Sequence, residues 1–321
     1  MADERAATRQ ALIDALDDVE PVPLPGDGAT EQRFAALAEL GAGDLAVARL
    51  AEGHLDAVAI CAEADREAPP GVLGVWASDP PFGRVTTAAV DGGWRLHGTK
   101  LWCSGGHLLD GALVTAHADD GYRLFVVRLD ASGIDVRSTW TAVGMRDSDT
   151  VDVDFHGVVV DRSAAIGGPG WYLDRRGFWI GGIGVAACWY GGALGALRAL
   201  HAAVERRDHD HHGLAHLGTA DALCAAMWAL LRVAADDVDD GIDGDDLRRL
   251  AWRVRAAVEQ LAPGVLRHAE RGIGAGGLTG DPAMARRAAD LPVYLRQHHA
   301  ERDLEALGRL RVANGLRVDH R

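Results

Sequence analysis

The sequence pattern changes twice along the chain, and these changes limit the fold more than any other feature. Residues 1 to about 70 carry apolar residues at helical spacing, as in FAALAEL and LAVARLAEGHLDAVAICAEA. Short runs typical of strands follow from 72 to about 166, and helical spacing returns after the glycine-rich turn at 167–170. The order predicts an α+β protein with a β-domain inserted between helical parts.

The middle region alternates apolar and polar residues, most clearly in VDVDFH at 151–156 and WRLH at 94–97. Turns rich in Gly and Asp separate these runs. By this spacing we predict a compact antiparallel β-domain of about six to eight strands. The predicted domains are an N-terminal helical domain (1–70), a middle β-domain (71–166) and a C-terminal helical bundle (167–321).

One segment, from Phe178 to Leu197, is uncharged over 20 residues, long enough to cross a bilayer. We expect instead a central helix buried in the bundle, because we see no second span and the helices after it look amphipathic. Two Gly- or Asp-rich stretches, at 208–218 and 271–282, are expected to interrupt the bundle.

The net charge of −14 argues against binding to nucleic acid or an anionic membrane, since these need clustered basic residues. Lys100 is the only lysine. The four cysteines form no C-x-x-C pair, and the first 20 residues are charged without an apolar core. These features predict a reducing, cytoplasmic location and no zinc knuckle.

Three motifs follow one another in the middle region: GVWASDP at 74–80, GTKLWCSGG at 98–106 and GMRDSDT at 144–150. Each motif alone is unspecific, and an unrelated β-domain with common turns could carry any one of them. As an ordered set they resemble the acyl-CoA dehydrogenase superfamily of flavoproteins, from about residue 34 to residue 312. The resemblance implies a helical domain, a middle β-domain and a C-terminal four-helix bundle that bind FAD, usually in a homodimer or homotetramer.

The resemblance also implies flavin contacts in the first two motifs. Trp102 would cover the isoalloxazine ring, and the Ser104 hydroxyl would contact its N5/O4 edge. Ser78 stands where the family has a flavin-binding threonine, with Trp76 nearby. Such residues suit a flat apolar ring with a polar edge. The alternative is that Trp102 belongs to the core and Ser104 merely ends a strand.

The adenosine end of FAD would approach a glycine loop of the neighbouring subunit. Arg206 matches the arginine of the family's E-R-x-x-F-G motif, but the Phe-Gly is absent. Arg271 stands where the loop usually opens with glutamine. A glycine-rich turn between two helices would look the same. The loop glycines implied by the resemblance are Gly274, Gly276 and Gly277.

Histidines gather at the start of the second bundle helix, at His209, His211, His212 and His216. Alternation of Asp and His in a Gly-containing connection is more typical of a solvated loop than of a metal site, which needs fixed and buried ligands. We therefore predict no metal.

The stretch LRQHHAERD at 295–303 lies where a family dehydrogenase carries the glutamate that removes the substrate α-proton. Alignment of the following helix puts Arg296 at the base position, and the first bundle helix offers only Val185 and Ala186 at the alternative position. The usual base is therefore missing. The family's G-A-G-S is also replaced by PFGR at 81–84, so the substrate pocket is expected to differ.

His298 or His299 could replace the glutamate, because imidazole titrates in the useful range. Glu301 and Asp303 lie one helical turn from them. The alternative is a surface or interface ion-pair network formed by Arg296, Glu301, Arg302 and Asp303.

Three functions remain open from the sequence. The first is α,β-dehydrogenation of an acyl thioester by an FAD-dependent oxidoreductase, with a protein as electron acceptor. The second is a base-less relative that acts as a flavin-dependent hydroxylase or monooxygenase. The third is a non-catalytic flavin-binding subunit.

Overall fold

The computed structural model describes residues 2–19, 21–207 and 210–314. The chain forms two compact units, Met1–Pro21 with Ala46–Phe178 and Val22–Leu45 with Trp179–Arg321. The division into three domains at residues 70 and 166 stays a prediction.

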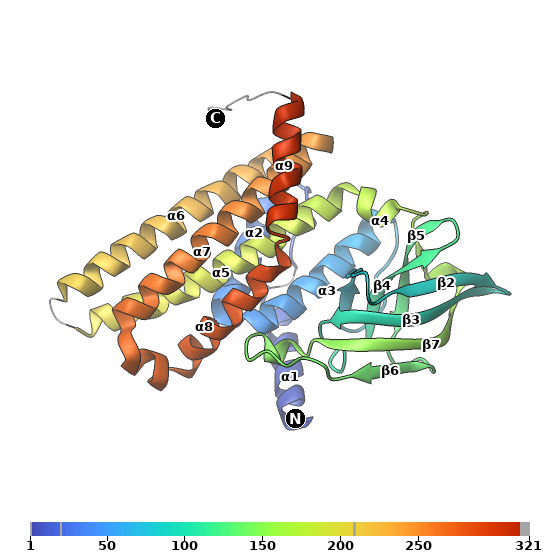
Figure 1. Cartoon of the computed structure of the whole chain (residues 1–321), viewed down its shortest axis with the longest axis horizontal. Helices are drawn as coiled ribbons and strands as arrows, with labels where there is room; N and C mark the ends of the chain where they lie inside the picture. Colours follow the sequence, from blue (N-terminus) through green and yellow to red (C-terminus); the bar gives the residue numbers. More distant parts are fainter. Residues whose placement is uncertain (1, 20, 208–209, 315–321) are drawn as a thin grey trace. The chain divides into compact units, whose positions relative to one another are not determined.

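The first unit combines an eight-stranded sheet with helices (Figure 1). Its helices are α1 (Ala2–Val19), α3 (Leu45–Glu63, from Ala46 on) and the short α4 (Trp171–Asp174). The strands described are β1 (Leu73–Trp76), β2 (Val85–Val90), β3 (Gly93–Cys103), β4 (Gly111–Ala118), β5 (Gly121–Arg128), β6 (Ile134–Arg137), β7 (Val151–Asp161) and β8 (Ala165–Ile166). Two 3₁₀ turns, η1 (Arg146–Ser148) and η2 (Arg162–Ala164), flank β7.

The strand order is β6-β7-β3-β2-β4-β5-β8, with β1 paired to β4. The prediction of an antiparallel sheet is wrong in two places, because β1 and β2 both pair with β4 in parallel. The reason lies in the connection: the β2–β3 hairpin separates β1 from β4, and so long a crossover allows parallel pairing. All other pairings are antiparallel.

The core of this unit forms where one face of α3 meets the sheet. Ala57, Ile60 and Cys61 pack against Leu73, Leu113, Leu124, Ile166 and Tyr172. A buried guanidinium closes the edge: Arg175 pairs with Glu63 at 2.9 Å and Asp56 at 3.4 Å. These carboxylates of α3 therefore fasten it to the segment that follows α4.

The second unit is helical, as expected for the bundle. It contains α2 (Thr30–Gly43), α5 (Arg176–Glu205, from Trp179 on), α6 (His211–Asp239), α7 (Gly244–Gly280), α8 (Pro282–Tyr294), the turn η3 (Leu295–Gln297) and α9 (Glu301–Asn314). Figure 1 shows α5, α6, α7 and α8 running alongside one another. Helices α2 and α5 cross at glycines, since a Cβ on Gly191 would lie 2.1 Å from the carbonyl oxygen of Ala38.

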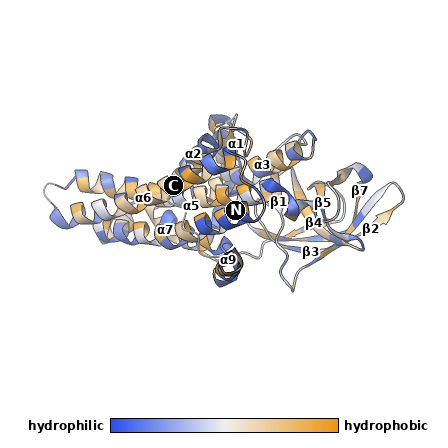
Figure 2. Cartoon of the chain, turned by 90° about the horizontal axis from the view of Figure 1, so that it is seen from above, coloured by the Kyte–Doolittle hydropathy of each residue, from blue (hydrophilic) through white to orange (hydrophobic). Residues whose placement is uncertain are grey.

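Two helices are long and apolar enough to cross a membrane, by length and composition alone: α5 and α6. The apolar window of α5 is 72% buried within the protein, as expected for a central helix, and that of α6 is 22% buried. The expectation that no second candidate span exists was therefore wrong. Figure 2 shows hydrophobic and hydrophilic residues interleaved along α6 and α7.

Both expected interruptions of the bundle are partly helical. Helix α6 already begins at His211, because the Asp210 carboxylate accepts hydrogen bonds from the amides of His212 and Gly213. His209 lies outside the described residues. The second interruption is a kink inside α7 at Gly274, where φ is 75°. The kink leaves backbone carbonyls without helical partners, which other groups then bind.

Candidate functional site

The end of β3 departs from regular strand backbone. Lys100 pairs with Val153 of β7 and Cys103 with Val151, so β3 holds one extra residue there. Within this bulge Trp102 has a φ of 58° and a side chain that is 53% exposed. A bulge re-aims a side chain, and left-handed backbone at a non-glycine residue is strained. An exposed aromatic surface is the result.

Trp102 does not stand alone at this surface. The ring of Phe82 meets it edge to face, with ring centroids 6.1 Å apart, and is itself exposed. The backbone amide of Trp102 donates to the Asp152 carboxylate at 3.3 Å. The strained tryptophan is therefore held by β7 on one side and presented to solvent on the other.

The three sequence motifs contact one another. Trp76 is buried, and its Nε1 donates to the carbonyl of Ser104 at 3.0 Å. The Ser78 hydroxyl donates to the carbonyl of Leu101. The Ser104 hydroxyl lies 3.1 Å from the Thr150 hydroxyl of the third motif. These contacts join Trp76, Ser78 and Ser104 beneath the exposed Trp102, although contacts of the four residues with a flavin stay predictions.

A second strained turn supports the same region. Met145 and Asp149 have φ values of 57° and 44°. The Asp149 carboxylate accepts from the backbone amide of His107 at 2.7 Å and from Arg5 of α1 at 3.1 Å. Sequence reasoning missed His107 and Arg5, since only the fold brings α1 to this turn.

The residues expected at the adenosine end of FAD have other surroundings. Arg207, and not the exposed Arg206, donates to the carbonyls of Gly272 and Ile273 at 2.6 Å each. These are carbonyls near the kink in α7. Gly274 makes the kink, Gly276 is exposed, and a Cβ on Gly277 would overlap the Ile273 side chain. A role for these residues with adenosine stays a prediction.

The stretch LRQHHAERD forms η3 and the turn into α9. Arg296 is 60% exposed at its side chain and pairs with Glu259 of α7. His299 is 57% exposed at its side chain and lies 3.4 Å from Asp303. Glu301 is exposed at the start of α9. Arg296 is therefore in a surface ion pair, but its partner is Glu259 of α7 and not one of the charged residues of this stretch.

His298 differs from its neighbour. It is 4% exposed, and Nε2 lies 4.0 Å from Asp303, beyond hydrogen-bond distance. Within the described part of the chain neither ring nitrogen has a hydrogen-bond partner. Burial, together with the nearby Arg255, lowers the pKa of His298, so the imidazole is neutral near pH 7.

Asp303 is a poor replacement for the absent glutamate. Burial alone would raise the pKa of Asp303, but hydrogen bonds and charge from His299 outweigh it and hold the pKa below its usual value. A carboxylate with a lowered pKa is a weaker base. His298, which is buried, neutral near pH 7 and without a hydrogen-bond partner among the described residues, is the remaining candidate proton acceptor in this segment.

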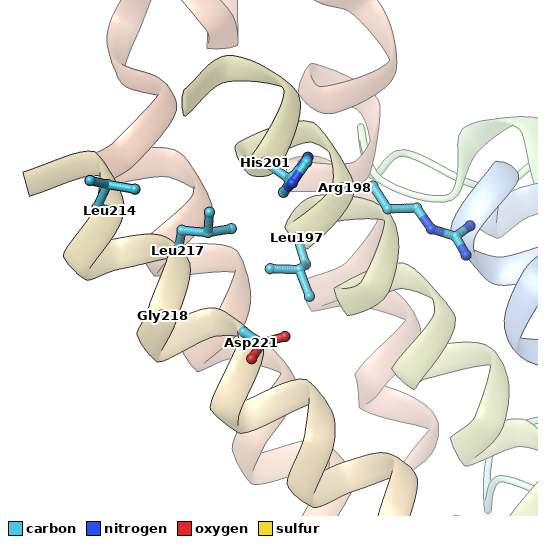
Figure 3. A pocket seen from close by; sticks show the side chains of 7 residues that line it. All are labelled: Leu197, Arg198, His201, Leu214, Leu217, Gly218 and Asp221. Carbon is cyan, nitrogen blue, oxygen red and sulfur yellow. The ribbon is translucent and has the colours of Figure 1, made fainter. Parts of the chain in front are cut away.

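A hollow of 560 Å³ lies between α5 and α6, and none of the predicted site residues lines it (Figure 3). Figure 3 shows the guanidinium of Arg198 pointing away from it. Arg198 pairs with Glu39 of α2 at 2.8 Å. A smaller apolar hollow of 180 Å³ borders Arg296, between α7 and α8. The larger hollow is lined by Leu197, Arg198, His201, Leu214, Leu217, Gly218 and Asp221.

Metal-binding side chains come together at one place among the described residues. Asp135, Asp154 and His156 have ligand atoms within 4.8 Å of one another on β6 and β7. Asp154 there already binds Arg137 and Thr99. We assign no metal to this group.

Comparison with known proteins supports the resemblance. A family model for the acyl-CoA dehydrogenase middle domain matches residues 78–158. Mitochondrial 2-methylacyl-CoA dehydrogenase of Solanum tuberosum is 29% identical over 117 residues, which cover 34% of this chain and 27% of that protein. Dibenzothiophene monooxygenase of Rhodococcus erythropolis is 32% identical over 89 residues, which cover 26% of this chain and 21% of that protein.

The match thus spans about a quarter of the length of these curated relatives. The fold agrees over nearly the whole chain. The structure of FMN-bound TdsC from Paenibacillus sp. A11-2 has a TM-score of 0.80 at 20% identity, covering 98% of this chain and 91% of that one. The helix–sheet–helix fold, the middle-domain match and these relatives lead to one conclusion: the chain belongs to the acyl-CoA dehydrogenase-like superfamily.

Proposed function

We propose that this protein is a flavin-dependent monooxygenase that acts on a small organic substrate, with His298 as proton acceptor. One observation carries the proposal. Where the family's dehydrogenases have a glutamate base, this chain has Arg296 in a surface ion pair and a buried, neutral His298 without a hydrogen-bond partner among the described residues. The monooxygenase among the relatives agrees with it.

The first unit fits a flavin on structural grounds. The exposed, strained Trp102 offers a flat apolar ring, with the Phe82 ring edge to face against it, and Ser104, two residues further on, carries a hydroxyl. A hydroxyl can make more than one hydrogen bond, so Ser104 can bind a polar ring edge while it contacts Thr150. A bound flavin, once reduced, would supply the electrons for oxygen chemistry.

We propose FMN as the cofactor, in place of the FAD that the sequence suggested. Arg207 already donates hydrogen bonds to the carbonyls of Gly272 and Ile273, just before the glycines expected to approach adenosine. The Phe-Gly that follows the family's arginine is absent after Arg206. TdsC, the structure of similar fold, is FMN-bound. Titration of the apoprotein with FMN and FAD, followed by flavin fluorescence, should give a dissociation constant at least about tenfold lower for FMN.

The second candidate is dehydrogenation of an acyl thioester, which the 2-methylacyl-CoA dehydrogenase relative favours. The deciding experiment starts with the flavin-loaded protein without oxygen. Bleaching of the flavin bands by a panel of acyl-CoAs would establish the dehydrogenase and end the monooxygenase proposal.

The complementary assay supplies chemically reduced flavin, oxygen and dibenzothiophene or another aromatic heterocycle. One oxygen atom enters the substrate and the other leaves as water, while the reduced flavin gives two electrons. An oxygenated product in this assay, with no bleaching by acyl-CoAs, supports the monooxygenase. No product and no bleaching with any substrate would favour the non-catalytic subunit.

We further propose that the protein is a cytoplasmic homodimer or homotetramer that receives electrons from a separate donor. The exposed, largely apolar side of α6, which includes Leu214 and Val233, supports self-association.

A further inference from the structure

Lys100 is the one lysine of the chain, and it is only 1% exposed. Apart from histidines, all the other basic side chains are arginines. Burying an ammonium group is costly unless hydrogen bonds and charge compensate it. The position of Lys100 on β3, two residues before the exposed Trp102, therefore calls for a physical reason.

The ammonium group makes its contacts on β4. Nζ donates to the carbonyl of Thr115 at 2.9 Å and to its hydroxyl at 2.7 Å. The Thr115 hydroxyl in turn donates to the carbonyl of Trp76 at 3.3 Å, at the end of β1. The chain of hydrogen bonds thus runs from β3 through β4 to the first motif.

Tyr122 of β5 joins the same network. Its hydroxyl donates to the Thr115 hydroxyl at 2.6 Å and lies 3.3 Å from the carbonyl of Ala77. The Thr115 hydroxyl that binds Lys100 therefore holds the carbonyl of Trp76, and the carbonyl of Ala77 lies beside the Tyr122 hydroxyl. The backbone just before Ser78 depends on this network.

The charge of Lys100 has no carboxylate partner within ion-pair distance among the described residues. The titratable groups that face it are Asp79, Cys103 and Tyr122. Asp79 is engaged by His117 at 2.9 Å, and the Cys103 sulfur lies 3.4 Å from the carbonyl of Lys100. A positive charge without a close counter-charge acts over a longer range in the protein interior than in water.

We propose that Lys100 is a positioning residue for the flavin: its ammonium group holds the first motif in place, and its positive charge favours reduced over oxidised flavin. The inference rests on the proposed flavin function. Reduction adds negative charge to the ring system, so a buried cation behind the Trp76–Trp102 region stabilises the reduced form.

Lysine differs from arginine here in one measurable way. Burial lowers the pKa of Lys100 to about 8, whereas arginine stays charged throughout the accessible range. The preference for reduced flavin should therefore weaken above about pH 8 in the natural protein.

The experiment compares the natural protein with Lys100→Met and Lys100→Arg. The dissociation constants of oxidised and reduced flavin are measured for each protein at pH 6.5 and pH 9.5. At the lower pH, the dissociation constant of oxidised flavin divided by that of reduced flavin should be about tenfold larger in the natural protein than in Lys100→Met. At the higher pH this difference should disappear, while Lys100→Arg keeps the large ratio at both pH values.

A second measurement uses the fact that Lys100 is the only lysine in the sequence. Lysine labelled with ¹³C at Cε gives a single side-chain NMR signal, whose titration in the apoprotein should report a pKa near 8. This titration needs no flavin and no activity. Arg128→Met, which removes an exposed cation paired with Asp130, is the control and should leave the flavin ratio unchanged.

The outcomes separate two failures. If the natural protein binds no flavin, the proposed function fails and this inference with it. If flavin binds and Lys100→Met folds with an unchanged ratio, only the role of Lys100 is overturned. If Lys100→Met does not fold, the natural protein alone still tests the role. The role is overturned if the Lys100 NMR signal titrates near pH 8 while the ratio of the two flavin dissociation constants does not change with pH.

Discussion

At the scale of single residues, the contrast between His298 and His299 decides which side chain can act as a base. The two are adjacent, yet one is buried without a hydrogen-bond partner in the described chain and the other is exposed beside Asp303. Leaving a buried polar group unpaired costs about 1–3 kcal/mol. A catalytic role is one of the explanations for such a group in a native protein.

His298→Ala should therefore lower turnover by about 10²–10⁴-fold, the usual contribution of a general base, while His299→Ala should have little effect. The pH profile has a defined sign. Because the pKa of His298 is below its ordinary value of 6.5 and the base acts unprotonated, turnover should fall only as the pH drops below that value. Steady-state rates from pH 5 to 8 check this, and equal losses in both variants would contradict it.

Trp102 offers a second residue-scale prediction, in which binding and stability separate. Trp102→Gly should weaken flavin binding about tenfold or more, because the aromatic surface is lost. The free energy of unfolding of the apoprotein should change by less than about 1 kcal/mol, since the side chain is half exposed and glycine relieves the left-handed strain. Flavin titration and urea unfolding measure the two effects. A large loss of stability would instead make Trp102 a core residue.

At the scale of elements, the close crossing of α2 and α5 contributes to the stability of the helical unit. Gly191 of α5 and Gly41 of α2 both lie against backbone atoms of the other helix. Because backbone cannot move aside as a flexible side chain can, an added methyl group must push the helices apart.

Gly191→Ala should accordingly lower the free energy of unfolding by about 1–3 kcal/mol. Gly218→Ala is the matched control, since it lies inside α6 with open space around its Cβ. Alanine favours helix over glycine, so this control should raise stability by about 0.5–1 kcal/mol. Denaturant unfolding of both variants gives the comparison. Similar changes in both would mean that the helix crossing is not tight.

At the scale of the whole molecule, the α6 surface decides whether the proposed oligomer forms. Ala225 and Ala229 are exposed one turn apart on α6. The double variant Ala225→Glu with Ala229→Glu should dissociate the oligomer, because charges buried at an interface without partners oppose association. Light scattering after size exclusion measures the mass, and Ala285→Glu on an exposed part of α8 is the control. An unchanged mass in the α6 variant would place the interface elsewhere.

Much of the fold could be predicted from local sequence because the physical causes are local. Helical spacing, alternation and turn residues placed the helices and strands, and the first strand begins at Leu73 and the last ends at Ile166. The three motifs implied a flavin-binding surface through their resemblance to the acyl-CoA dehydrogenase superfamily, and this surface stays a prediction. The local pattern predicted interruptions of the bundle at the histidine-rich start of α6 and at the glycine-rich part of α7, yet both are partly helical. Asp210 caps the start of α6, and Gly274 confines the second interruption to a kink.

The sequence by itself thus determined the order of elements, the family resemblance and the absence of the usual glutamate. Only the tertiary structure decided that β1 pairs in parallel with β4, that His298 is buried while His299 is not, and that Lys100 binds Thr115. The reason is physical. Strand pairing, burial and hydrogen bonding join residues far apart in the chain, and their energies depend on neighbours that no local window of sequence contains.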